Sequence, residues 1–310
     1  MKLSVVTTLF KSANYLPEFY ERVRATADRV CPDYEIIFVN DGSPDTSLAI
    51  ARAIACADAR VKVVDLSRNF GHHHAIVAGL SQVRGERVFL LDVDLEESPE
   101  WLADFWQKFE TSDVDVVYGV AAARGGNPLR VYLGSLFYKV FNLFSDIKIA
   151  ENMCTARLMS SEYVSALLTL PDRNLFLAGN FQWTGYRQIP MMVAKGSRPT
   201  TTYTAARRVA LAVNAITSFT AYPLTLIFMF GLTIAGLAGL VGVGLVVDKL
   251  LHPDTTLIGW PSVIASIWFL GGATICVVGV VGIYVSRIFV EAKGRPQYLI
   301  RKIYSGSDEA

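Results

Sequence analysis

The sequence predicts two parts of different character, an α/β domain with a mostly parallel sheet and a helical membrane region that follows it. Apolar runs rich in β-branched residues alternate with segments of helical periodicity up to about residue 200. Of the 29 basic and 28 acidic residues, only three fall between residues 209 and 286. The other charges give the rest of the chain the charge content of an ordinary globular domain. We therefore expect a folded domain over residues 1–204 and a membrane hairpin over residues 223–287.

Five strands and four helices are expected to alternate in the first domain. The strands are nearly continuous apolar runs, as in a parallel sheet whose two faces are both covered. The expected strands are Leu3–Thr8, Glu35–Asn40, Val61–Leu66, Arg87–Asp92 and Val114–Val120. The expected helices are Tyr15–Val30, Asp45–Ala57, His73–Val83 and Pro99–Phe109. Ligands of such a domain bind at the carboxyl ends of the strands.

A segment with a basic start and an apolar continuation, residues 205–222, joins this domain to the membrane region. We expect it to form an amphipathic helix at the membrane interface that ends near Pro223, or else to extend the first crossing. Residues 224–247 and 257–286 carry no charge. Each run is longer than the ~20 residues that a helix needs to cross the hydrocarbon core. The polar residues between the two runs predict a turn.

The basic residues predict the orientation of this hairpin. They flank it on both sides, at Lys195, Arg198, Arg207, Arg208, Arg287, Lys293, Arg295, Arg301 and Lys302. The turn carries only Lys249. The positive-inside rule then places the domain, both chain ends and a basic tail at residues 288–310 in the cytoplasm. The expected protein crosses its membrane twice.

Polar clusters follow three of the predicted strands. Asn40–Asp45 follows the second strand, Ser67–His72 the third, and Asp92–Glu96 the fourth. Each cluster alone is a weak signal, because aspartate, glycine and serine also favour ordinary turns. The carboxyl ends of parallel strands share one edge of a sheet, so the three clusters together predict a ligand site there.

The acidic cluster after the fourth strand has a specific chemistry. In an extended segment, side chains two residues apart point the same way, so Asp92, Asp94 and Glu96 are expected on one side. Three adjacent carboxylates repel one another unless a cation lies among them, and oxygen ligands suit Mg²⁺ or Mn²⁺ with a bound diphosphate. The alternative is an acidic helix start, the role expected for Glu97 and Glu100.

Several classes of protein and site are excluded or disfavoured. The four cysteines, Cys31, Cys56, Cys154 and Cys276, form no paired motif and are expected to be reduced. A net charge of +1 disfavours a nucleic-acid partner. The three histidines at 72–74 diverge too far on a helix to share one metal ion, although His72 is placed to contact a ligand or cap the helix. Small residues in the first crossing, Gly236, Gly239 and Gly242, allow a homo-oligomer.

The order and spacing of these motifs resemble glycosyltransferase family 2, in the branch of dolichyl-phosphate mannose synthases and bacterial polyprenyl-phosphate (bactoprenol) glucosyltransferases. The resemblance covers essentially the whole chain. The resembling positions are Leu3–Thr8, Glu35–Ser43, Leu66–Ala75, Leu91–Glu100, Arg124, Arg130, Ser135, Thr155–Met159 and Ser218–Phe219.

This resemblance implies a GT-A fold, a Rossmann-like domain that binds a nucleotide sugar. It also implies roles for particular residues, of which Asp92, Asp94, Arg124 and Arg130 would be catalytic. The implied nucleotide contacts are Thr8, Asp41, Ser67 and Asp92, the implied metal ligands are Asp92, Asp94 and Glu96, and the implied contacts to the acceptor phosphate are Arg124, Arg130 and Ser135. Departures from the family pattern, such as Asn40 in place of an aspartate, leave the identity of the donor open.

The implied reaction is the inverting, metal-dependent transfer of one sugar from a nucleotide diphosphate sugar to a polyprenyl phosphate at the bacterial inner membrane. The resemblance favours UDP-glucose, with UDP-N-acetylglucosamine, GDP-mannose and a modified arabinose as alternatives. A processive polysaccharide synthase is disfavoured, because Gln182–Tyr186 lacks the QxxRW pattern of those enzymes. A membrane-tethered scaffold with a vestigial nucleotide site is disfavoured by the intact Asp92 and Asp94.

Overall fold

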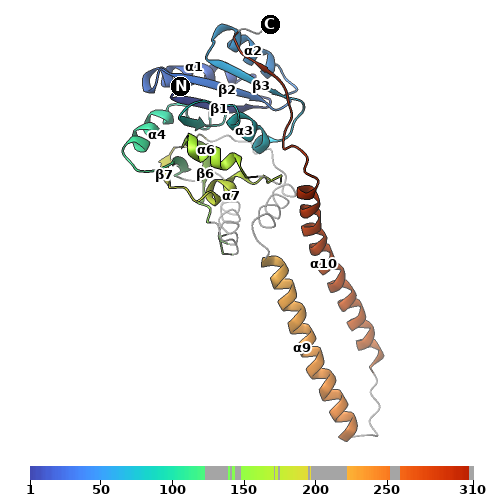
Figure 1. Ribbon diagram of the computed structural model, residues 1–310. Coiled ribbons are helices and arrows are strands. Elements are labelled where there is room, and N and C mark those ends of the chain that lie inside the picture. Colours follow the sequence, from blue (N-terminus) through green and yellow to red (C-terminus); the bar gives the residue numbers. More distant parts are fainter. Residues whose placement is uncertain are drawn as a thin grey trace. The chain divides into compact units, whose positions relative to one another are not determined.

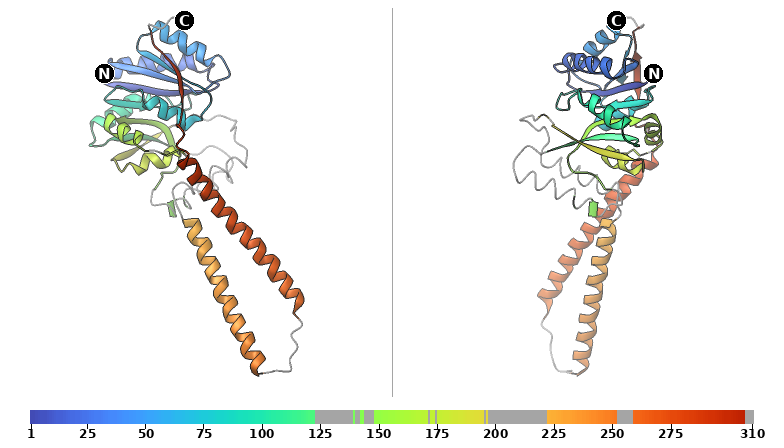
Figure 2. Two further views of the ribbon diagram at one scale, coloured as in Figure 1. Left: turned by 45° about the vertical axis from the view of Figure 1, so that its right-hand side comes forward. Right: turned by 90° about the vertical axis from the view of Figure 1, so that its left-hand side faces the viewer.

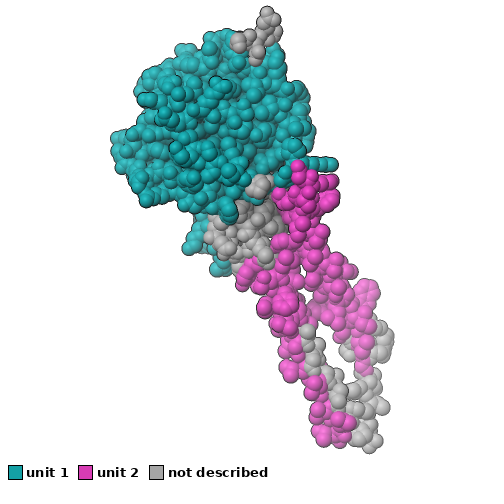
Figure 3. Space-filling view, viewed as in Figure 1, with its two compact units in different colours: residues 1–212, 295–310 teal, residues 213–294 magenta. Residues whose placement is uncertain are grey.

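The computed structural model divides into two compact units. It describes residues 1–122, 139, 142–143, 148–170, 172–173, 175–194, 196, 222–251 and 259–306. The first, the sheet unit, comprises Met1–Ala212 and Arg295–Ala310, and the second, the helical unit, comprises Val213–Gly294 (Figure 3). The chain therefore leaves the sheet unit, forms the helical unit and returns.

An eight-stranded sheet forms the centre of the sheet unit, with the order β7-β5-β6-β4-β1-β2-β3-β8 (Figure 1). The four strands β3, β2, β1 and β4 are parallel. Strand β6 is antiparallel to β4 and β5, β7 is parallel to β5, and β8 is antiparallel to β3. The strands are β1 (Leu3–Leu9), β2 (Tyr34–Asn40), β3 (Val61–Leu66), β4 (Arg87–Leu90), β5 (Val116–Ala121), β6 (Met153–Ser160), β7 (Gln188–Val193) and β8 (Ile300–Tyr304).

Helices cover both faces of this sheet. Helices α1, α2 and α4 pack with Leu3 and Val5 on one face, whereas α3, α6 and α7 pack with Val6 on the other. Alternate residues of β1 thus enter opposite cores, which explains its uninterrupted burial. The helices are α1 (Leu16–Val30), α2 (Ser47–Ala57), α3 (His72–Leu80), α4 (Trp101–Glu110), α6 (Ser161–Leu168) and α7 (Leu177–Trp183). The prediction of an α/β fold with a mostly parallel sheet is confirmed.

The last strand of the sheet comes from the C-terminal segment. Strand β8 runs along β3 and covers what would otherwise be an open edge (Figure 2). Residues 288–310 were expected to form a basic tail, and this strand was not predicted. The apolar residues of this segment do not alternate as in a typical strand. In the structure Ile300, Ile303 and Tyr304 are nevertheless partly buried, and the Arg52 guanidinium lies 4.5 Å from the centre of the Tyr304 ring.

The helical unit contains two long helices, α9 (Tyr222–Leu251) and α10 (Trp260–Ala292). Among the residues that the structure describes, Ser266–Ala292 is the one segment long and apolar enough to cross a membrane. Leu224–Ile234 of α9 is a shorter apolar stretch. The predicted interfacial helix, apart from Tyr222, lies outside the described residues. The turn was predicted at residues 248–256, but its first four residues, 248–251, continue α9, and the others lie outside the described residues.

Candidate active site

The carboxyl ends of the parallel strands bring most of the predicted site residues to one edge of the sheet. Thr8 lies near the end of β1, Asp41 directly follows β2, and Ser67 directly follows β3. Asp92 lies two positions beyond β4. These four residues are far apart in the sequence, and the parallel pairing of their strands gathers them. The three predicted acceptor residues, Arg124, Arg130 and Ser135, lie outside the described part of the chain.

Asp41 joins the end of β2 to the loop before α3. The side chain is only 2% exposed, and its two oxygens accept hydrogen bonds from the backbone N–H groups of Phe70 and Gly71, at 2.7 and 3.0 Å. Next to it, the Asn40 amide donates to the Asp65 carboxylate at 2.8 Å. Asp41 therefore fixes the shape of the loop that follows β3, where Ser67 lies.

Gly42 allows this loop to approach the end of β2 closely. Its φ is +58°, and a Cβ added there would lie 2.5 Å from the backbone nitrogen of Asn69. We expect Gly42→Ala to displace the loop, to destabilise the fold by about 1–3 kcal/mol and to weaken donor binding. Donor KM and the thermal midpoint would measure both effects.

Gly185→Ala is the matched control for this substitution. Gly185 also has a positive φ, +73°, but a Cβ there would meet no atom within 4 Å. Both variants carry the same kind of backbone strain, and only Gly42→Ala adds the collision. An equal donor KM in the two variants would contradict the role given to Gly42.

His72, the first residue of α3, connects Thr8 with Asp92. Its Nδ1 lies 3.0 Å from the Thr8 hydroxyl, and its Nε2 lies 3.4 Å from Asp92 Oδ1. Burial lowers the pKa of His72 below its ordinary value, despite the acidic side chains nearby. A neutral ring can accept from Thr8 at Nδ1 and direct its Nε2–H toward Asp92. The next residue, His73, instead bonds the Leu175 carbonyl at 3.0 Å.

The acidic cluster after β4 is a turn and not an extended segment. Strand β4 ends at Leu90, Leu95 has a φ of +61°, and the Glu96 N–H donates to Asp94 Oδ1 at 3.1 Å. The expectation that Asp92, Asp94 and Glu96 point to one side because the segment is extended is therefore wrong. Across the described residues, no three His, Cys, Asp or Glu side chains form a group that could hold a metal ion.

Asp92 and Asp94 nevertheless have the donor chemistry of a magnesium site that is completed by a ligand. Mg²⁺ is commonly held by one or two carboxylates together with waters and substrate phosphates, so a protein cage of three ligands is not required. Asp92 is oriented by the Thr155 hydroxyl, which donates to its Oδ2 at 2.9 Å. Asp92 and Asp94 thus fit a cation, whereas Glu96 as a ligand stays a prediction.

Glu97 links the acidic turn to β6. Its side chain is completely buried, and its two oxygens accept from the backbone N–H groups of Thr155 and Ala156 at 2.9 and 2.7 Å. Arg157, also buried, lies near enough for Glu97 to act on its charge, although burial lowers the pKa of Arg157 to about 10. Glu97 thereby holds Thr155 in place beside Asp92. The prediction of a simple helix start missed this role.

Glu100 has a different partner. It accepts two hydrogen bonds from the Arg22 guanidinium, at 2.9 and 2.7 Å, and this pairing lowers its pKa to about 2. Its side chain does not cap α4. Glu100 therefore joins α4 to α1 at the surface, whereas Glu97 serves the site.

Thr155 and Glu97 could not be assigned to the site from local patterns, because their contacts depend on β6 lying beside β4. The resembling segment Thr155–Met159 was the one signal that pointed to this strand. Together the site residues offer Asp92, contacted by Thr155 and His72, and Asp94, on the same edge of the sheet as the tight loop after β3. Such an edge suits a phosphorylated ligand with a divalent cation.

Comparison with known proteins identifies relatives over nearly the whole chain. The model of the family "Glycosyl transferase family 2" matches residues 4–168. A Mycobacterium tuberculosis protein whose name places it among the glycosyltransferases is 46% identical, over 99% of this chain and 90% of its own length. The SfII prophage-derived bactoprenol glucosyl transferase of Shigella flexneri is 35% identical, over 99% and 100%. A prophage bactoprenol glucosyl transferase homolog of Escherichia coli K12 is 33% identical, over 98% and 99%.

Proposed function

The chain belongs to glycosyl transferase family 2, and from that membership we propose that it moves one sugar from a nucleotide diphosphate sugar to the phosphate of a membrane polyprenyl phosphate. That it is a transferase follows from the family itself. The observation that carries the acceptor is the match to a bactoprenol glucosyl transferase over 99% of this chain and 100% of that one, which includes the region of α9 and α10. The same relative supports glucose as the sugar and, with the sequence resemblance, UDP-glucose as the donor.

In this proposal the donor lies across the strand ends. Thr8, Asp41 and Ser67 serve its nucleoside half, and Asp92 and Asp94 would hold a Mg²⁺ or Mn²⁺ ion. When bound, this ion would supply Lewis-acid stabilisation of the charge on the departing diphosphate. Thr155 and His72 keep the Asp92 carboxylate in one orientation throughout.

The proposed chemical step is a single displacement at the anomeric carbon. An oxygen of the acceptor phosphate forms a bond to this carbon while the bond to the diphosphate breaks, and the electron pair leaves with the diphosphate. A phosphate monoester has a second pKa of about 6 and is already largely dianionic at pH 7, so no general base is needed. Arg124, Arg130 and Ser135 are proposed to hold this phosphate, the arginines by paired N–H donors. The anomeric centre is inverted.

The membrane topology of the proposal follows from the path of the chain. Because β8 pairs with β3, the segments before and after the helical unit belong to one folded sheet. This path supports entry into and exit from the membrane on the same side, and hence an even number of crossings. With Ser266–Ala292 as one crossing, we propose α9 as the other, which the exposed Leu226, Phe228 and Phe230 support. The positive-inside rule then assigns the sheet unit to the cytoplasmic side of a bacterial inner membrane.

The test is transfer by the purified full-length protein in detergent or lipid. Polyprenyl phosphate and Mg²⁺ would be combined separately with UDP-glucose, UDP-N-acetylglucosamine and GDP-mannose, and the lipid products weighed by mass spectrometry. We expect UDP-glucose to yield a lipid heavier by one hexosyl unit, and a product from another donor alone would overturn glucose as the sugar. A polymer would indicate a processive synthase instead, and no product with any donor would favour a non-catalytic scaffold.

A further inference from the structure

The C-terminal strand carries an irregularity at the edge of the site. In the pairing of β8 with β3, Lys302 lies opposite Asp65 and Ile300 lies opposite Leu66, so Arg301 is an extra residue without a partner on β3. Such a bulge turns a side chain away from the regular alternation, and bulges are common beside active sites. Here the bulge falls where β3 ends and the loop with Ser67 begins.

The Arg301 guanidinium bridges two acceptors at this point. Its Nη1 lies 3.5 Å from Asp65 Oδ2, and its Nη2 donates to the Ser67 carbonyl at 2.6 Å. The N–H of Ser67 in turn donates to the Leu299 carbonyl at 2.9 Å. Ser67 is therefore held through both its N–H and its carbonyl by residues that follow the helical unit in the chain.

Burial and charge make this bridge more than a surface contact. Asp65 is only 1% exposed, and its other oxygen accepts from Asn40, the residue before Asp41. A buried carboxylate is costly unless it is paired, and the Arg301 guanidinium supplies a cation 3.5 Å from the Asp65 Oδ2 atom. The Arg301 side chain itself stays 60% exposed, which leaves part of its fork of five N–H donors accessible to a ligand.

The spacing of the sheet indicates which part of a donor this edge would meet. Strand β3 is three strands away from β4, through β2 and β1, which corresponds to about 14 Å at ordinary strand spacing. A diphosphate beside Asp92 and Asp94 would thus lie one nucleoside's length from Ser67. The base and ribose, and not the diphosphate, belong at the end of β3.

We propose that Arg301 is a positioning residue of the donor site, which the C-terminal strand completes by fixing Asp65 and the Ser67 loop to receive the nucleoside half of a nucleoside diphosphate. The proposal rests on the function proposed above. It gives β8, a segment beyond the matched family region, a part in binding the donor.

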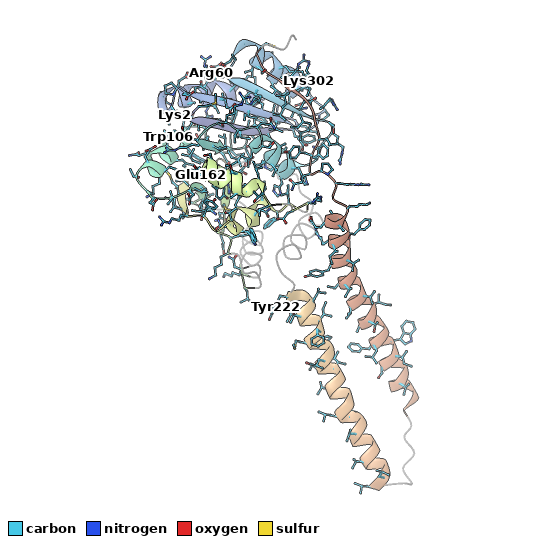
Figure 4. The ribbon with its side chains drawn as sticks, viewed as in Figure 1. Lys2, Arg60, Trp106, Glu162, Tyr222 and Lys302 are labelled. Carbon is cyan, nitrogen blue, oxygen red and sulfur yellow. The ribbon has the colours of Figure 1, made fainter. Side chains whose placement is uncertain are left out.

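Arg301→Ala in the full-length protein tests this role, with Lys302→Ala as the matched control. Lys302, which is labelled in Figure 4, neighbours Arg301 on the same strand. Its ammonium lies 5.0 Å from the centre of the Tyr304 ring. We expect Arg301→Ala to raise donor KM and the Kd of UDP or GDP, whichever the parent binds, about tenfold. The turnover number, acceptor KM and all constants of Lys302→Ala should stay within about twofold.

Arg301→Lys adds a second, more conservative variant. An ammonium group cannot bridge the Asp65 carboxylate and the Ser67 carbonyl as a planar fork does, so we expect donor binding to stay weak although the charge is kept. If Arg301→Ala does not fold, the lysine variant decides the question alone.

The outcomes separate this inference from the proposed function. Unchanged nucleotide affinity in a folded Arg301 variant would overturn it. A rise in both donor KM and acceptor KM together with an equal fall in the turnover number would also overturn it, because that pattern indicates a general disturbance of the fold. If the parent protein binds UDP or GDP but transfers no sugar, the reaction proposed above fails while the effect on nucleotide affinity still judges Arg301. If the parent binds neither nucleotide, both proposals fail.

Discussion

Turnover is expected to fall by at least about 10³-fold when Asp92 and Asp94 are both replaced by asparagine. The two carboxylates are the negative groups at the end of β4 that suit a cation and a diphosphate, and asparagine removes their charge while keeping their shape. An asparagine oxygen at 92 still accepts from the Thr155 hydroxyl, and one at 94 still accepts from the Glu96 N–H. The loss should therefore appear in activity and not in folding.

Initial rates of lipid glycosylation, measured over a range of Mg²⁺ and Mn²⁺ concentrations, would check this result. Asp104→Asn is the control for the chemical change, because Asp104 is exposed on α4 and loses one carboxylate by the same substitution. Thermal midpoints of both variants should stay within about 2 °C of the parent. Glycosylation by the double variant at the parent's rate would refute the role of this acidic pair.

The parallel core of the sheet was predictable because its signals are local. Strands β1, β2 and β3 are almost completely buried, because both faces of the sheet are covered. Their apolar composition alone therefore identifies them as strands. Strand β4 was predicted to reach Asp92 but ends at Leu90, and the chain then turns, with the Glu96 N–H donating to Asp94 and with a positive φ at Leu95. Strand β8 was not predicted from the sequence. Residues Ile300–Tyr304 form a strand because they pair with the edge of β3, which lies more than 230 positions earlier in the chain.

The residues of the candidate site were likewise predictable only where their signals are local. The polar residues that follow parallel strands, Asp41, Ser67 and Asp92, meet at one edge as expected. Asp41 was expected to contact a nucleotide, and the structure shows both of its oxygens accepting backbone N–H groups of the next loop. Residues that act through contacts between distant strands, such as Thr155 and Arg301, leave no local pattern. Identifying them requires the sheet order.

Glu97 is the clearest case of a residue whose role depends on such a contact, and Glu97→Ala is expected to destabilise the sheet unit by about 3–5 kcal/mol. The substitution leaves the backbone N–H groups of Thr155 and Ala156 buried without their acceptor. It also removes a negative charge that favours the charged form of the buried Arg157. For a unit of this size the thermal midpoint should fall by roughly 10 °C.

Glu100→Ala provides the contrast, because it deletes the same side chain three residues later. Glu100 is 44% exposed and pairs with Arg22 at the surface, where an ion pair contributes about 1 kcal/mol or less. Thermal unfolding followed by near-UV circular dichroism would compare the two, and Glu97→Gln, which keeps one acceptor oxygen, should fall between them. Because Glu97 also holds Thr155 against Asp92, its alanine variant should lose activity even at temperatures where it remains folded, whereas Glu100→Ala should not. Equal midpoints for the two alanine variants would mean that the link from the acidic turn to β6 does not stabilise the site.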